Sequence, residues 1–329
     1  MSVLVHIVTY NDQDCISPCI QSVLEQLGDS DTLEITDNAS IDKTVHELEK
    51  HRDSIKLFLN KENLGFCAAH NQAVYRFLNS SHDHILILNP DIIFKASFLK
   101  NFIKALEDSE AQIATPKLLR ADKDLQPIKP VIIDAAGMYF TNSFRHFDRG
   151  SNQEDLNQFD IPEFVIGGTG AALLLSKVAV EKLILPLTDF EESLYSIYPQ
   201  LREGREWRAQ LFDEAFFAYR EDAELALRSK SLGVSCLYVP SAVAYHQRVV
   251  LPERRSDLPQ EINAMSVRNR FLMQALHLKI DLLSLSFWGA IIRNLLVIAG
   301  VLVLERGSVS ALKEVSLLRK RAYFLRNTL

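Results

Sequence analysis

The stretch Ile85-Leu86-Ile87-Leu88-Asn89-Pro90-Asp91 is an apolar run that ends in a polar turn. Such short apolar runs between polar residues are typical of strands buried on both faces of a sheet. Pro90 disfavours helical geometry at Asn89, so Asp91 should lie just beyond the carboxyl end of the strand. Ligands bind at this edge of open α/β sheets, and a carboxylate there suits a divalent cation held against a diphosphate. Alternatively, Asp91 caps a helix that begins near Ala96.

Strands and helices alternate through the N-terminal part of the chain. The predicted order is strand 3–8, helix 15–27, strand 33–36, strand 55–59, helix 66–77 and strand 85–88. This alternation is typical of βαβ units, so we expect an α/β fold with a mostly parallel central sheet flanked by helices. The chain has no Gly-x-Gly-x-x-Gly after its first strand and no P-loop, so a nucleotide must be held in another way.

Polar residues at the ends of the first two strands are candidates for that role. Thr9, Tyr10 and Asn11 end the first strand, and Asp37 ends the second. The Asp37 carboxylate could accept the N3–H of a pyrimidine base. The alternative is that Asp37 and Asn38 only form a turn.

A glycine-rich stretch, Gly167-Gly168-Thr169-Gly170, precedes a predicted strand at 171–175. Glycines at this spacing indicate close approach of the backbone to a ligand or to a neighbouring strand. A bulge or tight bend without a ligand explains the same glycines equally well. The charged and aromatic segment 191–208 carries no pattern that predicts its structure.

Acidic residues open a predicted helix that ends before Gly233. Glu221 and Asp222 lie in its first turn, and Arg228 and Lys230 lie in its last. We expect the helix dipole to keep these carboxylates ionised, and an ionised carboxylate in a cleft can take a proton from a hydroxyl. The alternative is that the acids only stabilise the helix terminus.

His246 ends a predicted strand at 242–246, a position where a histidine is more often structural than a ligand. The loop that follows, 247–260, contains Arg248, Arg254 and Arg255. We expect this loop to be mobile and to attract anions.

The C-terminal part is expected to be helical and apolar. Residues 285–304 approach the length of a membrane span, but Arg293 and Asn294 lie at the centre and the uninterrupted run after them is too short. We expect packed or interfacial helices that make peripheral contact with an anionic membrane surface; a helical element for homo-oligomer formation is the alternative. The predicted domains are 1–250 and 251–329.

Composition narrows the class of protein. The net charge is −6, from 36 basic and 42 acidic residues, which argues against nucleic-acid binding. The four cysteines, Cys15, Cys19, Cys67 and Cys236, do not form two pairs with zinc-site spacing, so we expect reduced cysteines of a cytosolic protein. No basic region precedes the first apolar run, so no signal peptide is expected.

Taken in order, these motifs resemble a family 2 inverting glycosyltransferase of GT-A fold, over about residues 1–275. Within that family the chain resembles the rhamnosyltransferase-like branch that builds bacterial surface polysaccharide. The motifs that carry the resemblance are Thr9-Tyr10-Asn11, Asp37-Asn38-Ala39-Ser40, Asn63-Leu64-Gly65-Phe66 with Asn71, Leu88-Asn89-Pro90-Asp91, Gly168-Thr169-Gly170, Asp213-Glu214 through Tyr219-Arg220-Glu221-Asp222, and His246.

The resemblance implies a role for each motif. Asp91 matches the last acid of a metal-binding motif, so it would bind Mg²⁺ or Mn²⁺ at the donor diphosphate, and His246 matches a metal ligand of some relatives. Asp222 matches the general base, and Asn89 stands where many relatives of the wider fold have a first Asp. The implied donor site comprises Thr9, Tyr10, Asn11, Asp37, Asn63, Gly65, Phe66, Asn71, Asn89 and Asp91, and the implied acceptor side comprises Gly168, Thr169, Gly170, Asp213 and Glu214.

The implied reaction transfers a sugar from a nucleotide diphosphate donor to a saccharide or lipid-linked saccharide. By resemblance dTDP-rhamnose is the first choice of donor and a UDP-hexose the second, with the enzyme in the cytoplasm at the inner face of the cell membrane. One carboxylate suffices for inversion, whereas retention would need Glu221 as a nucleophile. The rivals are a catalytically degenerate nucleotide-sugar-binding protein and a sugar-nucleotide pyrophosphorylase, whose Gly-rich basic loop is absent after the first strand.

Overall fold

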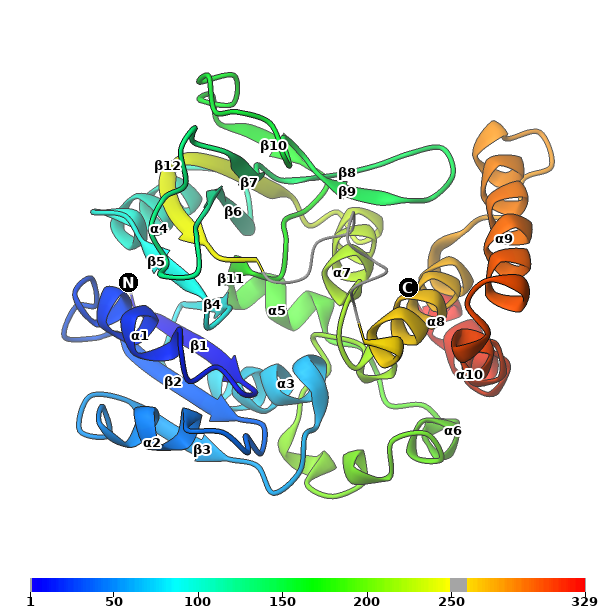
Figure 1. Cartoon of the computed structure of the whole chain (residues 1–329), viewed down its shortest axis with the longest axis horizontal. Coiled ribbons are helices and arrows are strands. Elements are labelled where there is room, and N and C mark those ends of the chain that lie inside the picture. Colours follow the sequence, from blue (N-terminus) through cyan, green and yellow to red (C-terminus); the bar gives the residue numbers. More distant parts are fainter. Residues whose placement is uncertain (1, 249–258, 329) are drawn as a thin grey trace.

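A mixed sheet forms the centre of the molecule, seen in a computed structural model that describes residues 2–248 and 259–328. The strands are β1 (Val3–Thr9), β2 (Thr32–Asp37), β3 (Lys56–Leu59), β4 (His84–Leu88), β5 (Ile92–Phe94), β6 (Ile113–Arg120), β7 (Ile133–Ala135), β8 (Met138–Phe140), β9 (His146–Asp148), β10 (Glu163–Val165), β11 (Ala172–Ser176) and β12 (Cys236–His246). The sheet has ten strands in the order β10-β12-β6-β11-β4-β1-β2-β3, with β5 paired to β12 and β7 to β6 (Figure 1). Strands β8 and β9 form a separate hairpin.

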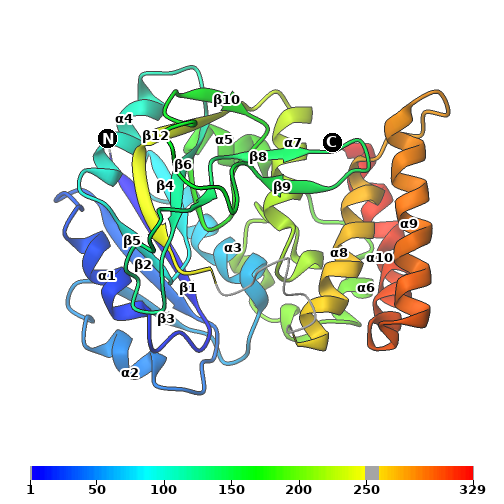
Figure 2. The same cartoon turned by 45° about the horizontal axis from the view of Figure 1, so that its top comes forward.

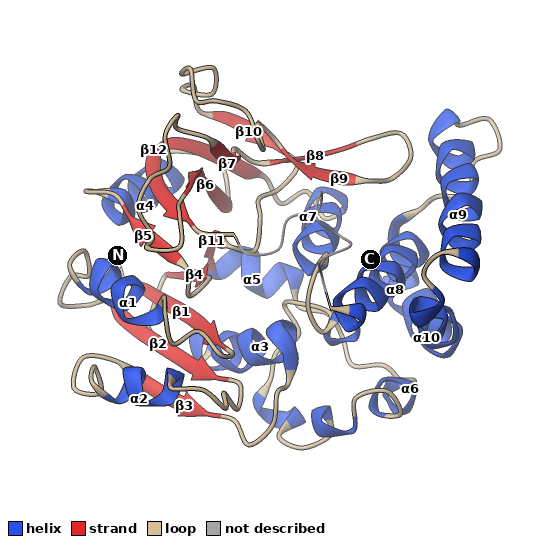
Figure 3. Ribbon diagram, viewed as in Figure 1, coloured by secondary structure: helices blue, strands red, loops and turns tan. Residues whose placement is uncertain are grey.

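Helices cover both faces of this sheet and gather on one side of it (Figure 3). They are α1 (Ile16–Leu24), α2 (Thr44–Glu49), α3 (Gly65–Leu78), α4 (Phe98–Glu107), α5 (Lys177–Leu183), α6 (Glu191–Tyr195), α7 (Glu221–Ser231), α8 (Gln260–His277), α9 (Leu285–Val303) and α10 (Val309–Thr328). Along the main path of the sheet, β10 and β11 run against the other strands. The prediction of an α/β fold with a mostly parallel sheet is therefore confirmed.

Strand β4 lies near the middle of the sheet, between β1 and β11. All five of its residues are buried, as the apolar run predicted. After it the Asn89 N–H donates to the Ala171 carbonyl (2.8 Å), which fixes the start of the turn that presents Asp91. The alternative role of Asp91 as a helix cap is wrong, because the short strand β5 follows and α4 begins only at Phe98.

The two faces of the sheet have separate apolar cores. One core packs α1, α2 and α4 against the sheet through residues such as Ile16, Leu48 and Phe98. The other packs α3, α5, α7, α8 and α10 and includes Phe77 and Leu225. Burial on both faces explains why the central strands are continuously apolar in sequence.

The C-terminal helices α8, α9 and α10 lie together at one side of the molecule, beside α7 (Figures 1 and 2). Helices α8 and α10 contribute Met273 and Leu325 to the core that also contains α3 and α7. The division of the chain at residue 250 stays a prediction, and apolar residues from both sides of it pack in one core. Of the predicted anion-attracting loop, Arg254 and Arg255 lie outside the described residues.

Helix α9 is the one helix, in the parts of the chain that the structure describes, whose length and composition would let it cross a membrane. Only 11% of its apolar stretch is buried against the rest of the protein. Asn294, one of the polar residues that interrupt the apolar run, faces inward, and its amide donates to Gln274 Oε1 of α8 (2.6 Å). The helix therefore has a polar contact with the protein on one side and an exposed apolar surface on the other.

Arg321 of α10 forms buried hydrogen bonds with residues of the segment 191–213. Its side chain is 1% exposed, and its Nη1 donates to Asp213 Oδ1 (2.6 Å). The same guanidinium donates to Glu191 Oε1 (3.2 Å) and Gln210 Oε1 (2.9 Å). Segment 191–208, which the sequence left without a prediction, is thus anchored at its start by the last helix.

We predict that Arg321→Ala lowers the free energy of unfolding by about 3–5 kcal/mol, because it leaves the buried Asp213 carboxylate without its counter-ion. Urea unfolding would measure the loss. The matched control is Arg319→Ala on the exposed face of the same helix, where we expect a change within about 0.5 kcal/mol. Equal stability of the two variants would contradict the role assigned to Arg321.

Candidate active site

A cleft of about 740 Å³ opens where β1, β2 and β4 end and continues to the start of α7. Its walls bring together many of the residues that the sequence motifs indicated. The predicted residues that line it are Tyr10, Asn63, Gly65, Phe66, Asn89, Asp91, Thr169, Gly170, Asp222 and His246. The carboxyl edge of the sheet and the acidic end of α7 therefore face one shared space.

The remaining predicted site residues lie outside the lining of the cleft. They are Thr9, Asn11, Asp37, Asn71, Gly168, Asp213 and Glu214, none of which lines the cleft in the described part of the chain. Their hydrogen bonds explain the difference, because most of these side chains hold backbone segments in place.

Asp37 joins the ends of β1 and β2. Its carboxylate accepts hydrogen bonds from the Thr9 hydroxyl (2.9 Å) and from the Ser40 N–H (2.9 Å), and the side chain is 1% exposed. The predicted contact from Asp37 to a nucleotide base stays a prediction, because the carboxylate also holds the Thr9 hydroxyl and the Ser40 N–H. The turn alternative describes the observed geometry, and Asn38 is the neighbouring residue that reaches the cleft.

Asn71, Asp213 and Glu214 form buried links between α3 and the segment before α7. The Asn71 amide donates to the Phe212 carbonyl (2.8 Å), and Asn71 Oδ1 accepts from the Phe212 N–H (3.0 Å). Glu214 is paired with the Arg208 Nε (3.0 Å), and Asp213 with Arg321. These side chains hold the segments behind the cleft in place, and their direct contact with donor or acceptor stays a prediction.

Glycines at two positions permit close packing that any side chain would prevent. A Cβ on Gly65, where φ is +79°, would come within 2.7 Å of the Phe217 carbonyl oxygen. A Cβ on Gly168 would come within 2.3 Å of the Thr115 Cβ. Gly168 thus serves packing against β6, whereas Gly65 lets α3 approach the loop before α7.

His246 links Asp91 to a second aspartate that the sequence did not indicate. Its Nε2 lies 3.3 Å from Asp91 Oδ1, and its Nδ1 lies 2.7 Å from Asp134 Oδ2. Burial lowers the pKa of His246, but the charges of Asp91 and Asp134 outweigh it and raise that pKa to about 10. Asp134 comes from β7, a three-residue strand without a sequence pattern, so only the pairing of β7 with β6 brings it here.

Asp91 and His246 are the residues that could contribute to a metal site. Asp91 Oδ1 is buried, and His246 Nε2 lies 3.3 Å from it, a contact in which a cation could replace the ring proton. Asp134 can hold the other ring nitrogen of His246, an arrangement that orients histidine ligands in metal sites. No group of three metal-binding side chains occurs among residues 2–248 and 259–328, so this pair supplies only part of a coordination shell.

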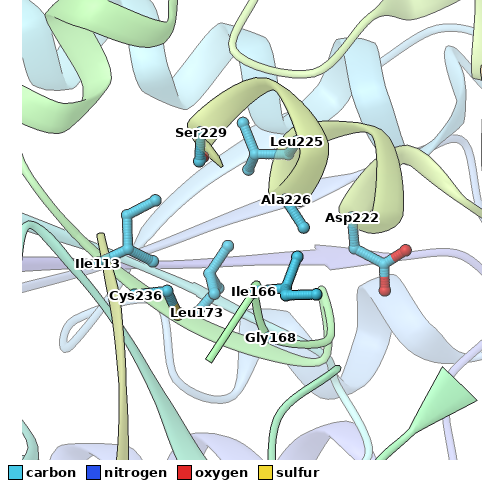
Figure 4. A pocket seen from close by; sticks show the side chains of 10 residues that line it. Ile113, Ile166, Gly168, Leu173, Asp222, Leu225, Ala226, Ser229 and Cys236 are labelled. Carbon is cyan, nitrogen blue, oxygen red and sulfur yellow. The ribbon is translucent and has the colours of Figure 1, made fainter. Parts of the chain in front are cut away.

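Asp222 lies at the start of α7 with its carboxylate held by main-chain amides. The Gly170 N–H donates to Asp222 Oδ2 (3.1 Å), and the Ala223 N–H donates to Oδ1 (2.7 Å). Figure 4 shows the Asp222 carboxylate pointing away from a small apolar pocket that includes Ile113, Leu173 and Leu225. This orientation leaves the carboxylate on the side of the large cleft, which Asp222 also lines.

The two acids at this helix terminus both have a raised pKa, with different opposing influences. Burial raises the pKa of Glu221 well above its ordinary value, and the charge of Asp222 adds to the shift. Burial also raises the pKa of Asp222, but the Gly170 and Ala223 amides and the charges of Arg248 and Arg220 oppose it. Burial therefore opposes the expected ionisation of both acids, and at Asp222 the two amides and the two arginines favour the charged form.

The loop before α7 has an unusual backbone that α8 holds in place. Phe217, Tyr219 and Arg220 all have positive φ, which is uncommon for residues other than glycine. The buried Asn269 amide donates to the carbonyls of Phe216 (2.8 Å), Ala218 (2.8 Å) and Tyr219 (2.7 Å). Asn269 belongs to a helix whose sequence pattern gave no sign of this role.

The chain matches the model of the Glycosyl transferase family 2 over residues 4–178. It is 28% identical over 171 residues to the rhamnosyltransferase WbbL of Escherichia coli (strain K12), a match that covers 52% of this chain and 54% of WbbL. The matched region thus spans about half the length of that curated relative.

Solved structures show the same fold at low sequence identity. Residues 1–349 of S. aureus TarS in complex with UDP-GlcNAc match with a TM-score of 0.53 at 13% identity, covering 99% of this chain and 88% of that one. Mannosyltransferase PcManGT from Pyrobaculum calidifontis, in complex with GDP-Man and Mn²⁺, matches with a TM-score of 0.51 at 14% identity. The match covers 99% of this chain and 84% of PcManGT. GalNAc-T7 with UDP, GalNAc and Mn²⁺ matches with a TM-score of 0.59 at 12% identity. The match covers 84% of this chain and 48% of the GalNAc-T7 chain. With a family match over more than half its length and the GT-A fold of these structures, the chain belongs to glycosyltransferase family 2.

Proposed function

We propose that this enzyme is a metal-dependent inverting transferase that moves rhamnose from dTDP-rhamnose to a saccharide or lipid-linked acceptor during surface polysaccharide synthesis. The observation that carries the proposal is the single cleft that Asp91, His246 and Asp222 share. The 28% sequence identity to the rhamnosyltransferase WbbL over 171 residues supports rhamnose as the first choice of transferred sugar. A UDP-hexose is the second choice, supported by the UDP-GlcNAc in one TarS structure.

The donor would bind at the carboxyl edge of the sheet. Tyr10, Asn38 and Asn63 line this end of the cleft and are suited to contact the base and the ribose. Asp91 and His246 would hold the Mg²⁺ or Mn²⁺, and the Mn²⁺ in the PcManGT and GalNAc-T7 structures supports such an ion. The bound cation would neutralise the charge that develops on the leaving diphosphate.

Asp222 would act as the general base. As the acceptor hydroxyl oxygen bonds to the anomeric carbon, its proton passes to the Asp222 carboxylate and the bond from that carbon to the diphosphate oxygen breaks. Attack from the face opposite the diphosphate inverts the anomeric centre. The raised pKa of Glu221, caused by burial and by Asp222, disfavours it as a nucleophile and so supports inversion over retention.

The exposed apolar side of α9 supports a place for the enzyme in the cytoplasm, in peripheral contact with the inner face of the cell membrane. Exposed side chains on α9 include Leu285, Trp288, Ile292 and Leu296. Apolar residues with such spacing on one helix side can enter the interface of a bilayer. Burial of the same surface between two copies of the chain is the alternative.

We expect Asp222→Asn to lower the transfer rate by about 100- to 10,000-fold, because the isosteric amide cannot take the proton. Nucleotide binding should be retained. The rate would be measured as release of nucleoside diphosphate from the donor in the presence of a lipid-linked acceptor. Glu221→Gln is the matched control and should lose far less activity, since the proposed base Asp222 remains; normal turnover by Asp222→Asn would remove the base role.

The first test of the proposed function is calorimetric titration with dTDP, UDP and GDP, each with Mn²⁺ and with EDTA. We expect Mn²⁺-dependent binding of dTDP, weakened at least about tenfold by Asp91→Ala, because charge-assisted contacts are lost. Asp124→Ala, on an exposed turn, is the control. Preferential UDP binding would favour a UDP-hexose donor, and nucleotide binding without any transfer would favour the degenerate binding protein. Absence of any nucleotide binding would contradict the proposed function.

A further inference from the structure

Arginines from three separate elements lie at, or just behind, the part of the cleft that α9 and the β8–β9 hairpin form. Arg145 directly precedes β9, Arg270 belongs to α8 and Arg293 to α9. The turn of the β8–β9 hairpin packs on α9, where a Cβ on Gly289 would lie 3.2 Å from the Asn142 carbonyl oxygen. Figures 1 and 2 show this hairpin reaching toward the C-terminal helices.

Within residues 2–248 and 259–328, these arginines gather without an acidic partner. Among the described residues no carboxylate forms an ion pair with any of the three. Arg270 is 4% exposed and donates to Asn294 Oδ1 (3.1 Å) and to the Ser143 carbonyl (3.5 Å), which are neutral. The Arg293 Nε is buried and has no acceptor.

Other arginines of the cleft wall are engaged differently. Arg248 pairs with Asp148 (2.6 Å), and Arg220 donates to the Ser266 carbonyl (3.1 Å). Burial and the charges of Arg293 and Arg145 lower the pKa of Arg270 to about 10, which reflects mutual repulsion within the group. An assembly of like charges in a partly buried place is costly until an anion enters.

The anion must fit both the arginines and the cleft. Arg145 and Arg293 line the cleft that Asp222 also lines, whereas Arg270 supports them from α8. Guanidinium groups donate in a planar fork that matches phosphate oxygens. The site therefore favours a phosphate or diphosphate group carried by the molecule that occupies the cleft beside Asp222.

The helix that supplies Arg293 also limits the choice of ligand. Arg293 lines the cleft, and Asn294 bonds to α8. Leu295, Leu302 and Val303 on the same helix are exposed. A ligand with an anionic head and a long apolar tail would satisfy both surfaces at once. A free nucleotide sugar would bind only the arginines and would leave the apolar side of α9 exposed.

We infer that Arg145, Arg270 and Arg293 form a subsite for the diphosphate of a polyprenyl-diphosphate-linked acceptor, with the lipid chain lying along α9. This inference rests on the proposed function, because it gives the acceptor a place in the cleft that also contains the proposed base. The subsite would set the distance between the membrane surface and the acceptor hydroxyl.

The test uses the full chain and phosphatidylcholine vesicles that contain undecaprenyl diphosphate, undecaprenol or phosphatidylglycerol. We expect binding to the diphosphate vesicles to be at least about tenfold tighter than to the other two, and Arg145→Ala or Arg293→Ala to remove most of that difference. Arg319→Ala, on the exposed face of α10, should behave like the wild type. Two separate variants keep the test valid if one of them fails to fold.

Several outcomes would overturn the inference. Equal binding to phosphatidylglycerol vesicles would show a general attraction to anionic lipid, and unchanged binding of both arginine variants would place the diphosphate elsewhere. Loss of Mn²⁺-dependent nucleotide binding in the same variants would assign the arginines to the donor. A wild-type protein that binds the diphosphate vesicles but no nucleotide would retain the subsite while the proposed transfer reaction fails.

Discussion

The hydrogen bonds from Arg268 and Asn269 to the loop before α7 are the constraint on which the site depends. Asn269 bonds three carbonyls of that loop, and Arg268 Nη2 donates to the Phe216 carbonyl (2.9 Å). Backbone with positive φ at non-glycine residues costs about 1–3 kcal/mol each and persists only where its surroundings hold it. Since this loop leads directly into Asp222, the proposed base is positioned by α8. Arg268 is in turn bonded to Glu314 of α10 (2.9 Å), so the C-terminal helices are part of the active-site scaffold.

The cleft divides into regions of different charge because different elements form its ends. The carboxyl edge of the sheet supplies Asp91, which faces His246, while α9 and the β8–β9 hairpin supply Arg293 and Arg145. Asp222 lines the same cleft as both groups. A transferase needs a donor site and an acceptor site that meet at one reacting carbon. The proposed donor site at the sheet edge and the proposed acceptor site at the helical surface would meet this need, because one cleft joins them.

Much of the fold was predictable because its signals are local. The apolar run of β4, the alternation of strands and helices, and the acids at the start of α7 each depend on neighbouring residues, and the structure has each of them. The motifs also placed Asp91, His246 and Asp222 in one cleft. Asp37 and Asn71 were assigned to the donor site on the same grounds, yet their side chains are satisfied internally, because a polar residue near a strand end can equally well hold the backbone.

The sequence by itself determined the fold class, the family and the position of the acids at the sheet edge and helix terminus, since periodicity and chain geometry act over short distances. The tertiary structure alone decided which polar residues reach the cleft. Asp134 meets His246 only because β7 pairs beside β6, and the three arginines meet only because a hairpin and two helices pack together. Such contacts join residues more than a hundred positions apart, and burial then fixes the protonation and the partners of each group.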